Sequence, residues 1–236
     1  MNNQSFRPRI ALCGGMAFTP TSQVLDKALL RLSGARAPRL TLIGSSPDPR
    51  GVFRAARGHF NPLGAYVLPT RIGVTDPQMD MLSLDDTLND SQIIYFTDGS
   101  PSYLVEILSN SHELKAIRHG MDNGMMIIAQ GASAMALCDL FWDGDGWEHG
   151  LGLLHGIAVL PHHERLAARF SPERLRRDLA ETLTFIGVDE GTGAVLEGKD
   201  GHVVGAKEVT IYRPAGSQQY VTGQRFTLDN DPLVDG

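Results

Sequence analysis

The ten residues IIAQGASAMA, positions 127–136, indicate the fold class of this chain. An apolar run over 125–129 has the length of a buried strand and leads into Gly131-Ala132-Ser133, a turn of small residues. The residues from Ala134 onward have helical character. A strand, a tight turn and a helix in succession are typical of α/β proteins, and a nucleophile elbow holds its serine at such a turn. We therefore predict an α/β fold with Ser133 at the apex of the turn.

The same alternation continues on both sides of this stretch. Apolar runs predict strands, and amphipathic patterns predict helices. Because parallel strands require helical crossovers, we predict a mostly parallel sheet flanked by helices on both faces. The strands are expected at 10–12, 40–43, 65–68, 93–96 and 157–160, and the helices at 21–32, 52–58, 103–108, 113–119 and 172–184.

The C-terminal part has a different pattern. Short apolar runs at 194–196, 202–204 and 209–212 are separated by glycines, which is a spacing typical of hairpins. We therefore predict a mixed or antiparallel edge at this end of the sheet. No repeat or Pro-rich linker divides the chain, so we expect one domain with a core of about residues 8–213 and a polar tail at 214–236.

The composition is that of an ordinary globular protein and excludes several classes. The 236 residues include 27 acidic and 21 basic ones, which gives a formal net charge of −6. A net acidic chain has no general attraction to nucleic acid, and no apolar run approaches the roughly 18 residues of a membrane span. Residues 1–9 lack the features of a secretory signal, so we expect a cytoplasmic location. Cys13 and Cys138 are too few for a disulfide framework or a four-thiolate metal site.

Chemically capable residues follow several predicted strands, where sites form in open α/β sheets. Gly14-Gly15 follows the first strand, and TDGSPS, residues 97–102, follows the strand at 93–96. Backbone N–H groups of such a loop can stabilise a developing oxyanion. His162 and His163 follow the strand at 157–160, and either could be the base that a serine nucleophile needs.

An orienting carboxylate for such a base has several candidates. Asp189 and Glu190 lie before a predicted hairpin. The rival acids closer to Ser133 in the sequence are Asp139, Asp143, Asp145 and Glu148. The chain also has residues of the types that bind metals, which are His149, His155, His162, His163 and Glu164. Their spacing matches no metal-binding motif, so we expect neither a metal nor a cofactor.

The ordered set of these motifs resembles the dipeptidase E and cyanophycinase family of serine peptidases, which are relatives of the class I glutamine amidotransferase fold. The resemblance spans residues 10 to about 212. Its landmarks are Gly14-Gly15, IIYFTDG at 93–99, GASA at 131–134, GLGLL at 150–154, PHH at 161–163, the arginines Arg169 and Arg174, and GVDEGT at 187–192.

The resemblance implies a serine exopeptidase for small peptides with an aspartyl or β-aspartyl residue before the scissile bond. Ser133 would attack and form an acyl-enzyme, His163 would act as base and Glu190 would orient it. His162 is the alternative base and Glu148 the alternative acid. The remaining implied roles are oxyanion donation by the backbone of Gly99 and Ala134, and substrate binding by Asp98, Gly15, Arg169 and Arg174.

Three departures from the family pattern open an alternative. Met135 stands where the elbow usually has a glycine, Asp98-Gly99-Ser100 replaces a Gly-Gly-Asn or Gly-Gly-Asp loop, and Pro161-His162 replaces an acid–polar pair. The alternative is a catalytically inactive relative that binds a small ligand on the same fold. An amidotransferase is disfavoured because that class has a cysteine at the elbow. The sequence leaves the oligomeric state open, a homodimer included.

Overall fold

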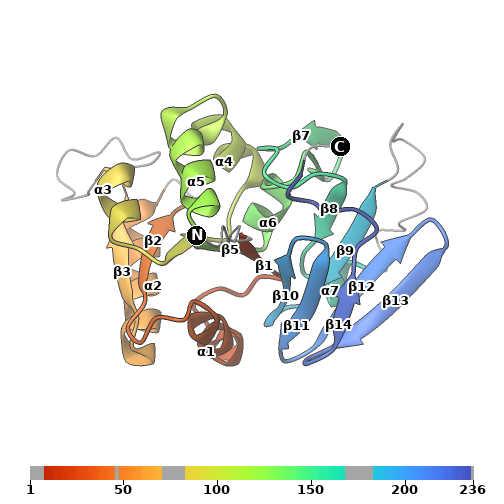
Figure 1. Ribbon diagram of the computed structural model, residues 1–236, viewed down its shortest axis with the longest axis horizontal. Helices are drawn as coiled ribbons and strands as arrows, with labels where there is room; N and C mark the ends of the chain where they lie inside the picture. The colour runs from red at the N-terminus through yellow and green to blue at the C-terminus, as the bar shows by residue number, and fades with distance from the viewer. Residues whose placement is uncertain (1–7, 46–47, 71–82, 168–182, 235–236) are drawn as a thin grey trace, which may run out of the picture.

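A computed structural model describes residues 8–45, 48–70, 83–167 and 183–234 as an α/β protein built around one large sheet (Figure 1). In spatial order the strands are β14 (Arg225–Thr227), β11 (Asp200–Gly205), β10 (Thr192–Glu197), β1 (Arg9–Cys13), β5 (Met126–Gln130), β4 (Ile93–Phe96), β2 (Arg39–Ile43) and β3 (Tyr66–Pro69). The four neighbouring pairs from β1 to β3 in this order are parallel, and the three pairs from β1 to β14 are antiparallel. The predicted mostly parallel sheet with an antiparallel C-terminal edge is confirmed.

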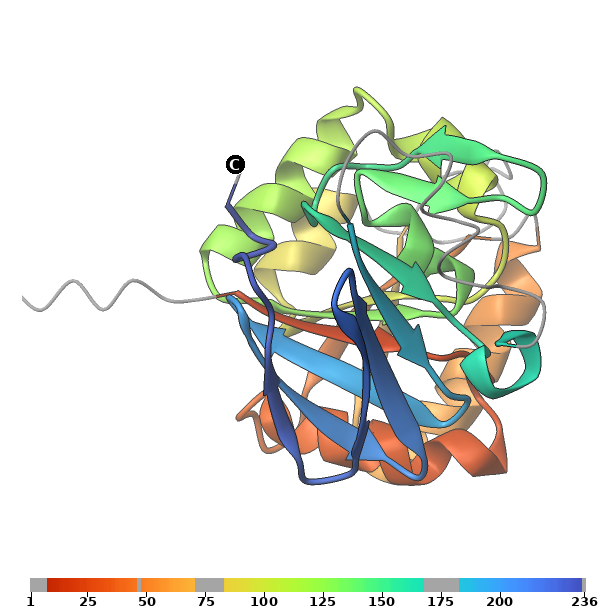
Figure 2. The same cartoon turned by 90° about the vertical axis from the view of Figure 1, so that its right-hand side faces the viewer.

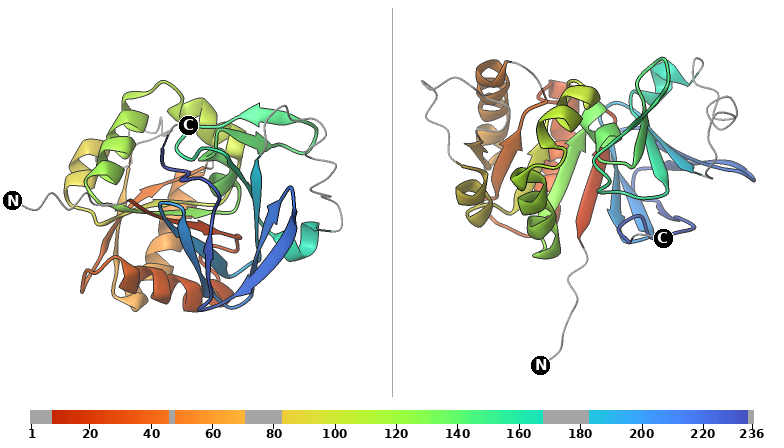
Figure 3. Two further views of the ribbon diagram at one scale, coloured as in Figure 1. Left: turned by 45° about the vertical axis from the view of Figure 1, so that its right-hand side comes forward. Right: turned by 90° about the horizontal axis from the view of Figure 1, so that it is seen from above.

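Helices cover both faces of this sheet (Figure 3, left). One face carries α1 (Gln23–Leu32) and α2 (Pro49–Phe60). The other carries α3 (Leu84–Asn89), α4 (Pro101–Leu108), α5 (His112–Asp122) and α6 (Ala132–Ala136). Short 3-10 turns, η1 (Pro20–Ser22) and η2 (Asn61–Leu63), precede α1 and follow α2.

The central strands are mostly apolar and buried because both of their faces are covered. Successive side chains of a strand point to opposite faces. Ile127 and Ala129 of β5 therefore pack in the core on the side of α4 to α6, whereas Met126 and Ile128 pack on the side of α1 and α2. Two core clusters, one on each face, fix the sheet between the two helical layers.

A second sheet extends the core on the α4–α6 side. Its strands, in order, are β13 (Gly216–Val221), β12 (Glu208–Arg213), β9 (Thr184–Val188) and β8 (Ile157–Leu160). The short helix α7 (His163–Leu166) follows β8, and β6 (Leu140–Trp142) pairs with β7 (Trp147–His149) in a separate hairpin. The C-terminal strands, in blue, lie together on the side that faces the viewer in Figure 2.

The structure differs from the sequence prediction in the C-terminal region. The strand at 208–213 belongs to the second sheet rather than to the edge of the main one. Residues 216–221 form β13 and 225–227 form β14, so the described part of the predicted tail, residues 214–234, is not a loose segment. Phe226 and Leu228 are buried in the main core, which ties this segment to the domain. Most of the helix predicted at 172–184 lies outside the described residues, and Thr184 itself begins β9. No helix in the described ranges has the length and apolar character needed to cross a membrane.

Candidate functional site

The turn after β5 is made by a single glycine. The strand ends at Gln130, α6 begins at Ala132, and Gly131 between them has φ 50° and ψ −118°. Its N–H donates to the carbonyl oxygen of Cys13 at the end of β1 (2.9 Å). This is the sharp strand-to-helix turn at which an elbow enzyme carries its nucleophile. The residue at the apex is therefore Gly131, which has no side chain.

Ser133 does not stand at the apex, so this part of the prediction is wrong. The serine lies inside α6 and is fully buried. Its hydroxyl donates to the carbonyl oxygen of Thr97 (2.5 Å) and lies 3.2 Å from Oγ of Ser45. Ser133 thereby joins α6 to the residues that follow β2 and β4, which is a structural position in the core.

The sequence contains a signal for the correct position of the apex. An elbow needs small residues two places before and two places after its apex. With Ser133 as apex the second of these is Met135, whereas with Gly131 as apex the two are Ala129 and Ser133. With Gly131 as the apex, Met135 no longer stands at a position where the elbow needs a small residue.

The Asp98 carboxylate fills the space beside the apex. Its Oδ1 accepts hydrogen bonds from the backbone N–H groups of Gly99 (2.9 Å) and Ala132 (3.0 Å). A β-carbon on Gly131 would lie 2.3 Å from the same oxygen. Two N–H groups that converge on one oxygen at this distance form the geometry of an oxyanion hole. The predicted donor Gly99 is thus in place, but its N–H is bonded to Asp98.

Ala134 is not the second donor, which corrects the prediction. Its N–H donates to the carbonyl oxygen of Gly131 (3.0 Å) within the first turn of α6. The N–H directed at the Asp98 carboxylate belongs to Ala132, the residue after the apex. The shift from Ala134 to Ala132 is the same two-residue shift that moves the apex from Ser133 to Gly131.

His162 is the histidine that pairs with Glu190. Its Nδ1 lies 2.8 Å from Oε1 of Glu190, and its Nε2 lies 3.6 Å from Oδ2 of Asp98. The residue adopts a left-handed conformation (φ 50°, ψ 36°), and its N–H donates to the carbonyl oxygen of Gly14. A β-carbon on Gly15 would lie 2.3 Å from Cε1 of the ring, so Gly15 is the surface against which the imidazole packs.

His163, the predicted base, points to a different place. Its Nε2 lies 2.8 Å from the hydroxyl of Tyr212, its Nδ1 lies 3.4 Å from Oδ1 of Asp189, and its ring packs on Gly187. The pairing of His163 with Glu190 is therefore wrong, because the turn at His162 sends the two adjacent side chains in different directions. The alternative acid Glu148 is exposed on the β6–β7 hairpin. Arg169 and Arg174 lie outside the described residues.

Glu190 is held firmly beneath His162. Its side chain is about 6% exposed, and its Oε2 lies 3.0 Å from the Arg165 guanidinium. The backbone N–H of Glu190 donates to the Glu164 carboxylate (3.0 Å), which also pairs with Lys207 (2.6 Å). The acid that orients the imidazole is thus fixed at both its side chain and its backbone.

The charges of the site stabilise one another. Partial burial raises the pKa of Asp98, but His162 and the N–H groups of Ala132 and Gly99 outweigh this effect and lower that pKa below its usual value. The Asp98 carboxylate raises the pKa of His162, against the effect of partial burial, and Glu190 adds to the rise. The arrangement favours an imidazolium between two carboxylates.

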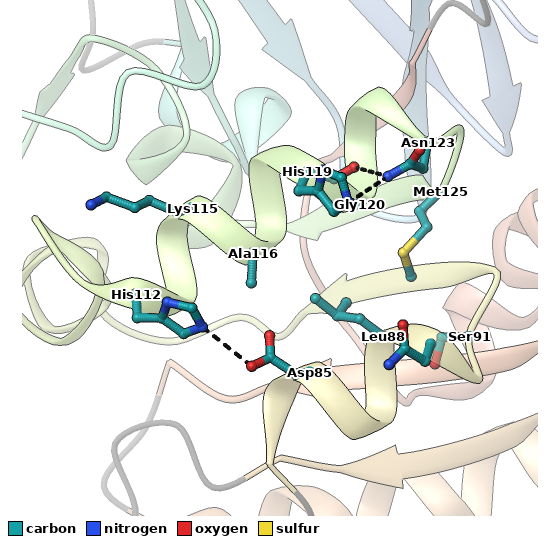
Figure 4. A pocket seen from close by; sticks show the side chains of 11 residues that line it. Asp85, Leu88, Ser91, His112, Lys115, Ala116, His119, Gly120, Asn123 and Met125 are labelled. Carbon is teal, nitrogen blue, oxygen red and sulfur yellow. Dashed lines mark hydrogen bonds and ion pairs between the residues drawn. The ribbon is translucent and has the colours of Figure 1, made fainter.

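A separate cavity of the described chain lies away from this site. A cavity of about 590 Å³ lies between α3 and α5, near the amino ends of β4 and β5 and so at the opposite edge of the sheet (Figure 4). Asp85 and His112 pair at one end of it, and His119 and Asn123 at the other. None of the predicted site residues lines it. Within the described ranges, no group of three or more His, Cys, Asp or Glu side chains is arranged to hold a metal ion.

Comparison with known proteins places the fold. No protein-family model and no curated protein matches the chain. A solved structure of a peptidase from an acI-B1 Actinobacterium matches with a TM-score of 0.76 and 20% sequence identity, over 95% of this chain and 98% of that one. The chain has a peptidase-like fold. A candidate peptidase E protein from Listeria monocytogenes EGD-e matches with a TM-score of 0.60 and 15% identity, over 85% of this chain and 100% of that one. The resemblance to the dipeptidase E group is confirmed at the level of the fold.

Proposed function

We propose that this chain is a non-hydrolysing relative of the peptidase E-like proteins and that it binds a small ligand at the elbow. The observation that carries the proposal is the glycine at the apex. Acyl transfer by this type of site needs a nucleophile within hydrogen-bond reach of the base. The group that faces Nε2 of His162 is the Asp98 carboxylate, at 3.6 Å, and the apex itself has no side chain to offer.

Asp98 adds two further obstacles to covalent catalysis. Its carboxylate holds both N–H groups that would stabilise a developing oxyanion. It also occupies the space that a nucleophilic side chain on residue 131 would need, because the β-carbon of such a side chain would lie 2.3–2.5 Å from the carboxylate atoms. A serine at 131 would therefore require the Asp98 carboxylate to leave the position that it occupies here.

Several groups that could recognise a ligand lie close together. Convergent N–H groups, an imidazole, the buried Glu190 carboxylate and the partly exposed Asp98 carboxylate meet near the carboxyl ends of β1, β4 and β5, where α/β proteins bind their ligands. A fold can keep its binding site while its chemistry changes, so function must follow the site. The residues of this site support recognition and do not support nucleophilic attack.

A serine exopeptidase is the second candidate. It is favoured by the fold shared with named peptidases and by the His162–Glu190 pair, which is the arrangement of a base and its orienting acid. The substrate would be a small peptide with an aspartyl or β-aspartyl residue before the scissile bond. In this mechanism the Ser133 hydroxyl would have to leave Thr97 and Ser45 and reach His162, after which it would attack the carbonyl and form an acyl-enzyme.

One experiment separates the two candidates. The folded protein is incubated with a fluorophosphonate probe, and labelled peptides are mapped by mass spectrometry. A set of aspartyl and β-aspartyl dipeptides is tested in parallel, with Ser133→Ala as the matched control. We expect no labelling and no hydrolysis above the control. Labelling at Ser133 that is lost in Ser133→Ala would establish the peptidase and overturn the proposal.

A further inference from the structure

We propose that the elbow binds the carboxylate of a small organic acid and that the Asp98 side chain is an internal competitor for that ligand. The inference rests on the proposed function, since it assumes that the site recognises without reacting. It concerns which chemical group the site takes and what controls access to it.

The Asp98 carboxylate is held in the way that a bound ligand is held. Its partners come from three separate segments, which are its own loop at Gly99, the start of α6 at Ala132 and the residue after β8 at His162. Its side chain is 30% exposed, so solvent reaches it. A structural carboxylate of the same chain is very different, because Asp26 pairs with His59 in the core and is 1% exposed.

The groups that hold this carboxylate do not depend on the Asp98 side chain. Two of the donors are backbone N–H groups fixed by β4, β5 and α6. The third is an imidazole that Glu190 orients at 2.8 Å and Gly15 supports from behind. If the Asp98 side chain rotates away, two N–H donors that converge on one oxygen position remain, with the imidazole at ion-pair distance from the second oxygen position, and this arrangement suits a planar carboxylate.

An external carboxylate can take the place of the Asp98 carboxylate beside the imidazole. Asp98 and Glu190 flank His162, and Arg165 faces the far oxygen of Glu190. An external carboxylate in the place of Asp98 restores the same charge beside the imidazole. A neutral amide of the same shape does not, and its NH₂ group would face donors instead of accepting from them.

The space for the ligand depends on Gly131. A β-carbon at this position would lie 2.3–2.5 Å from the carboxylate atoms, which is well inside van der Waals contact. The same glycine that removes the nucleophile therefore makes room for a ligand carboxylate. A methyl group at 131 should close the site to both the internal and the external acid.

The test is an acetate titration of the full chain carrying Asp98→Ala. Acetate is the probe, acetamide is its neutral isostere, and sodium chloride at matched ionic strength controls for general salt effects. The readouts are the ¹⁵N resonances of the His162 imidazole and the thermal unfolding temperature. We expect saturable acetate binding, binding of acetamide weaker by about tenfold or more, and wild-type protein that needs about tenfold more acetate. Asp98→Ala/Gly131→Ala is the matched variant and should bind no acetate while keeping its circular dichroism.

Each outcome has a defined meaning. The inference is overturned if acetate leaves the His162 resonances of Asp98→Ala unchanged, or shifts them equally when Gly131 is also alanine. If Asp98→Ala does not fold, recovery of its circular dichroism by acetate and not by acetamide supports the inference, and recovery by neither overturns it. Fluorophosphonate labelling of the wild-type chain would overturn the proposed function instead, whatever acetate does.

Discussion

Replacing Gly131 by serine and Asp98 by glycine in the same chain should create a nucleophile where the wild-type protein has none. Serine at the apex would stand at the strand-to-helix turn, with His162 and Glu190 already paired behind it at 2.8 Å. Removal of the Asp98 carboxylate would free the N–H groups of Gly99 and Ala132, which now donate to it at 2.9 and 3.0 Å. The double variant would thus have a nucleophile, a base, an orienting acid and two oxyanion donors.

The expected magnitudes follow from these contacts. Loss of one oxyanion donor costs about 10²-fold or more in rate, so Gly131→Ser alone should be up to about 10⁴-fold slower than the double variant, the full factor applying if the displaced Asp98 carboxylate still accepts from both N–H groups. The single variant also places a β-carbon 2.3 Å from Oδ1 of Asp98. Overpacking of this kind costs about 1–3 kcal/mol, and the positive φ at 131 adds about 1–3 kcal/mol in either variant.

The assay is the rate of fluorophosphonate labelling, followed by hydrolysis of activated esters and aspartyl dipeptides. Asp98→Gly alone should remain unlabelled because it has no nucleophile. His162→Ala in the double variant should remove most of the labelling because the base is lost. The reasoning is refuted if the folded double variant is not labelled at residue 131, or if its labelling does not depend on His162.

Three further outcomes are expected. Ser133→Ala should lower the free energy of unfolding by about 1 kcal/mol in urea denaturation, since it removes one buried hydroxyl while Ser45 still donates to Thr97. The same substitution should leave the His162 resonances unchanged, and a large shift of those resonances would contradict the structural role of Ser133. The pKa of His162, followed by NMR, should lie above its usual value and fall in Asp98→Asn. Because the pKa of His162 is raised in the folded state, the stability that its charged form contributes is complete below pH about 6.5 and is lost as the pH rises through the pKa of the folded protein. The difference in unfolding free energy between wild type and Asp98→Asn should therefore shrink at alkaline pH. A difference that grows there would be inconsistent with the ion pair. Gly15→Ala should lower stability by about 1–3 kcal/mol and displace His162, since its β-carbon meets the imidazole at a φ of 105°; unchanged His162 resonances would show that the ring packs elsewhere.

The sequence predicts the main sheet well because its central strands are short, mostly apolar runs. The runs at 10–12, 93–96 and 125–129 are covered on both faces, and such runs have few alternatives in a chain of this length. The second sheet was harder to predict. Residues 216–221 are mostly polar and exposed, and they form a strand because β12 offers an edge for pairing. Tertiary pairing of this kind leaves little trace in local composition.

The sequence predicts which loops meet at the site, but it does not predict which residues of those loops contact one another. Asp98, Gly99, Gly15 and Glu190 all lie where the strand ends were expected to bring them. The sequence prediction places the apex two residues too far along, because Ser133 has the side chain of a nucleophile whereas the turn is made by Gly131. The choice between His162 and His163 depends on one backbone conformation, the left-handed turn at His162, which a non-glycine residue adopts only when its surroundings require it.

The contact between residue 131 and the Asp98 side chain also constrains how this chain can change. A serine introduced at 131 alone meets the carboxylate of residue 98, and a glycine introduced at 98 alone leaves the apex empty of any side chain. The first substitution alone gives a much slower reaction than the pair, and the second alone gives none. The effects of the two substitutions should therefore be non-additive, because the benefit of each depends on the other.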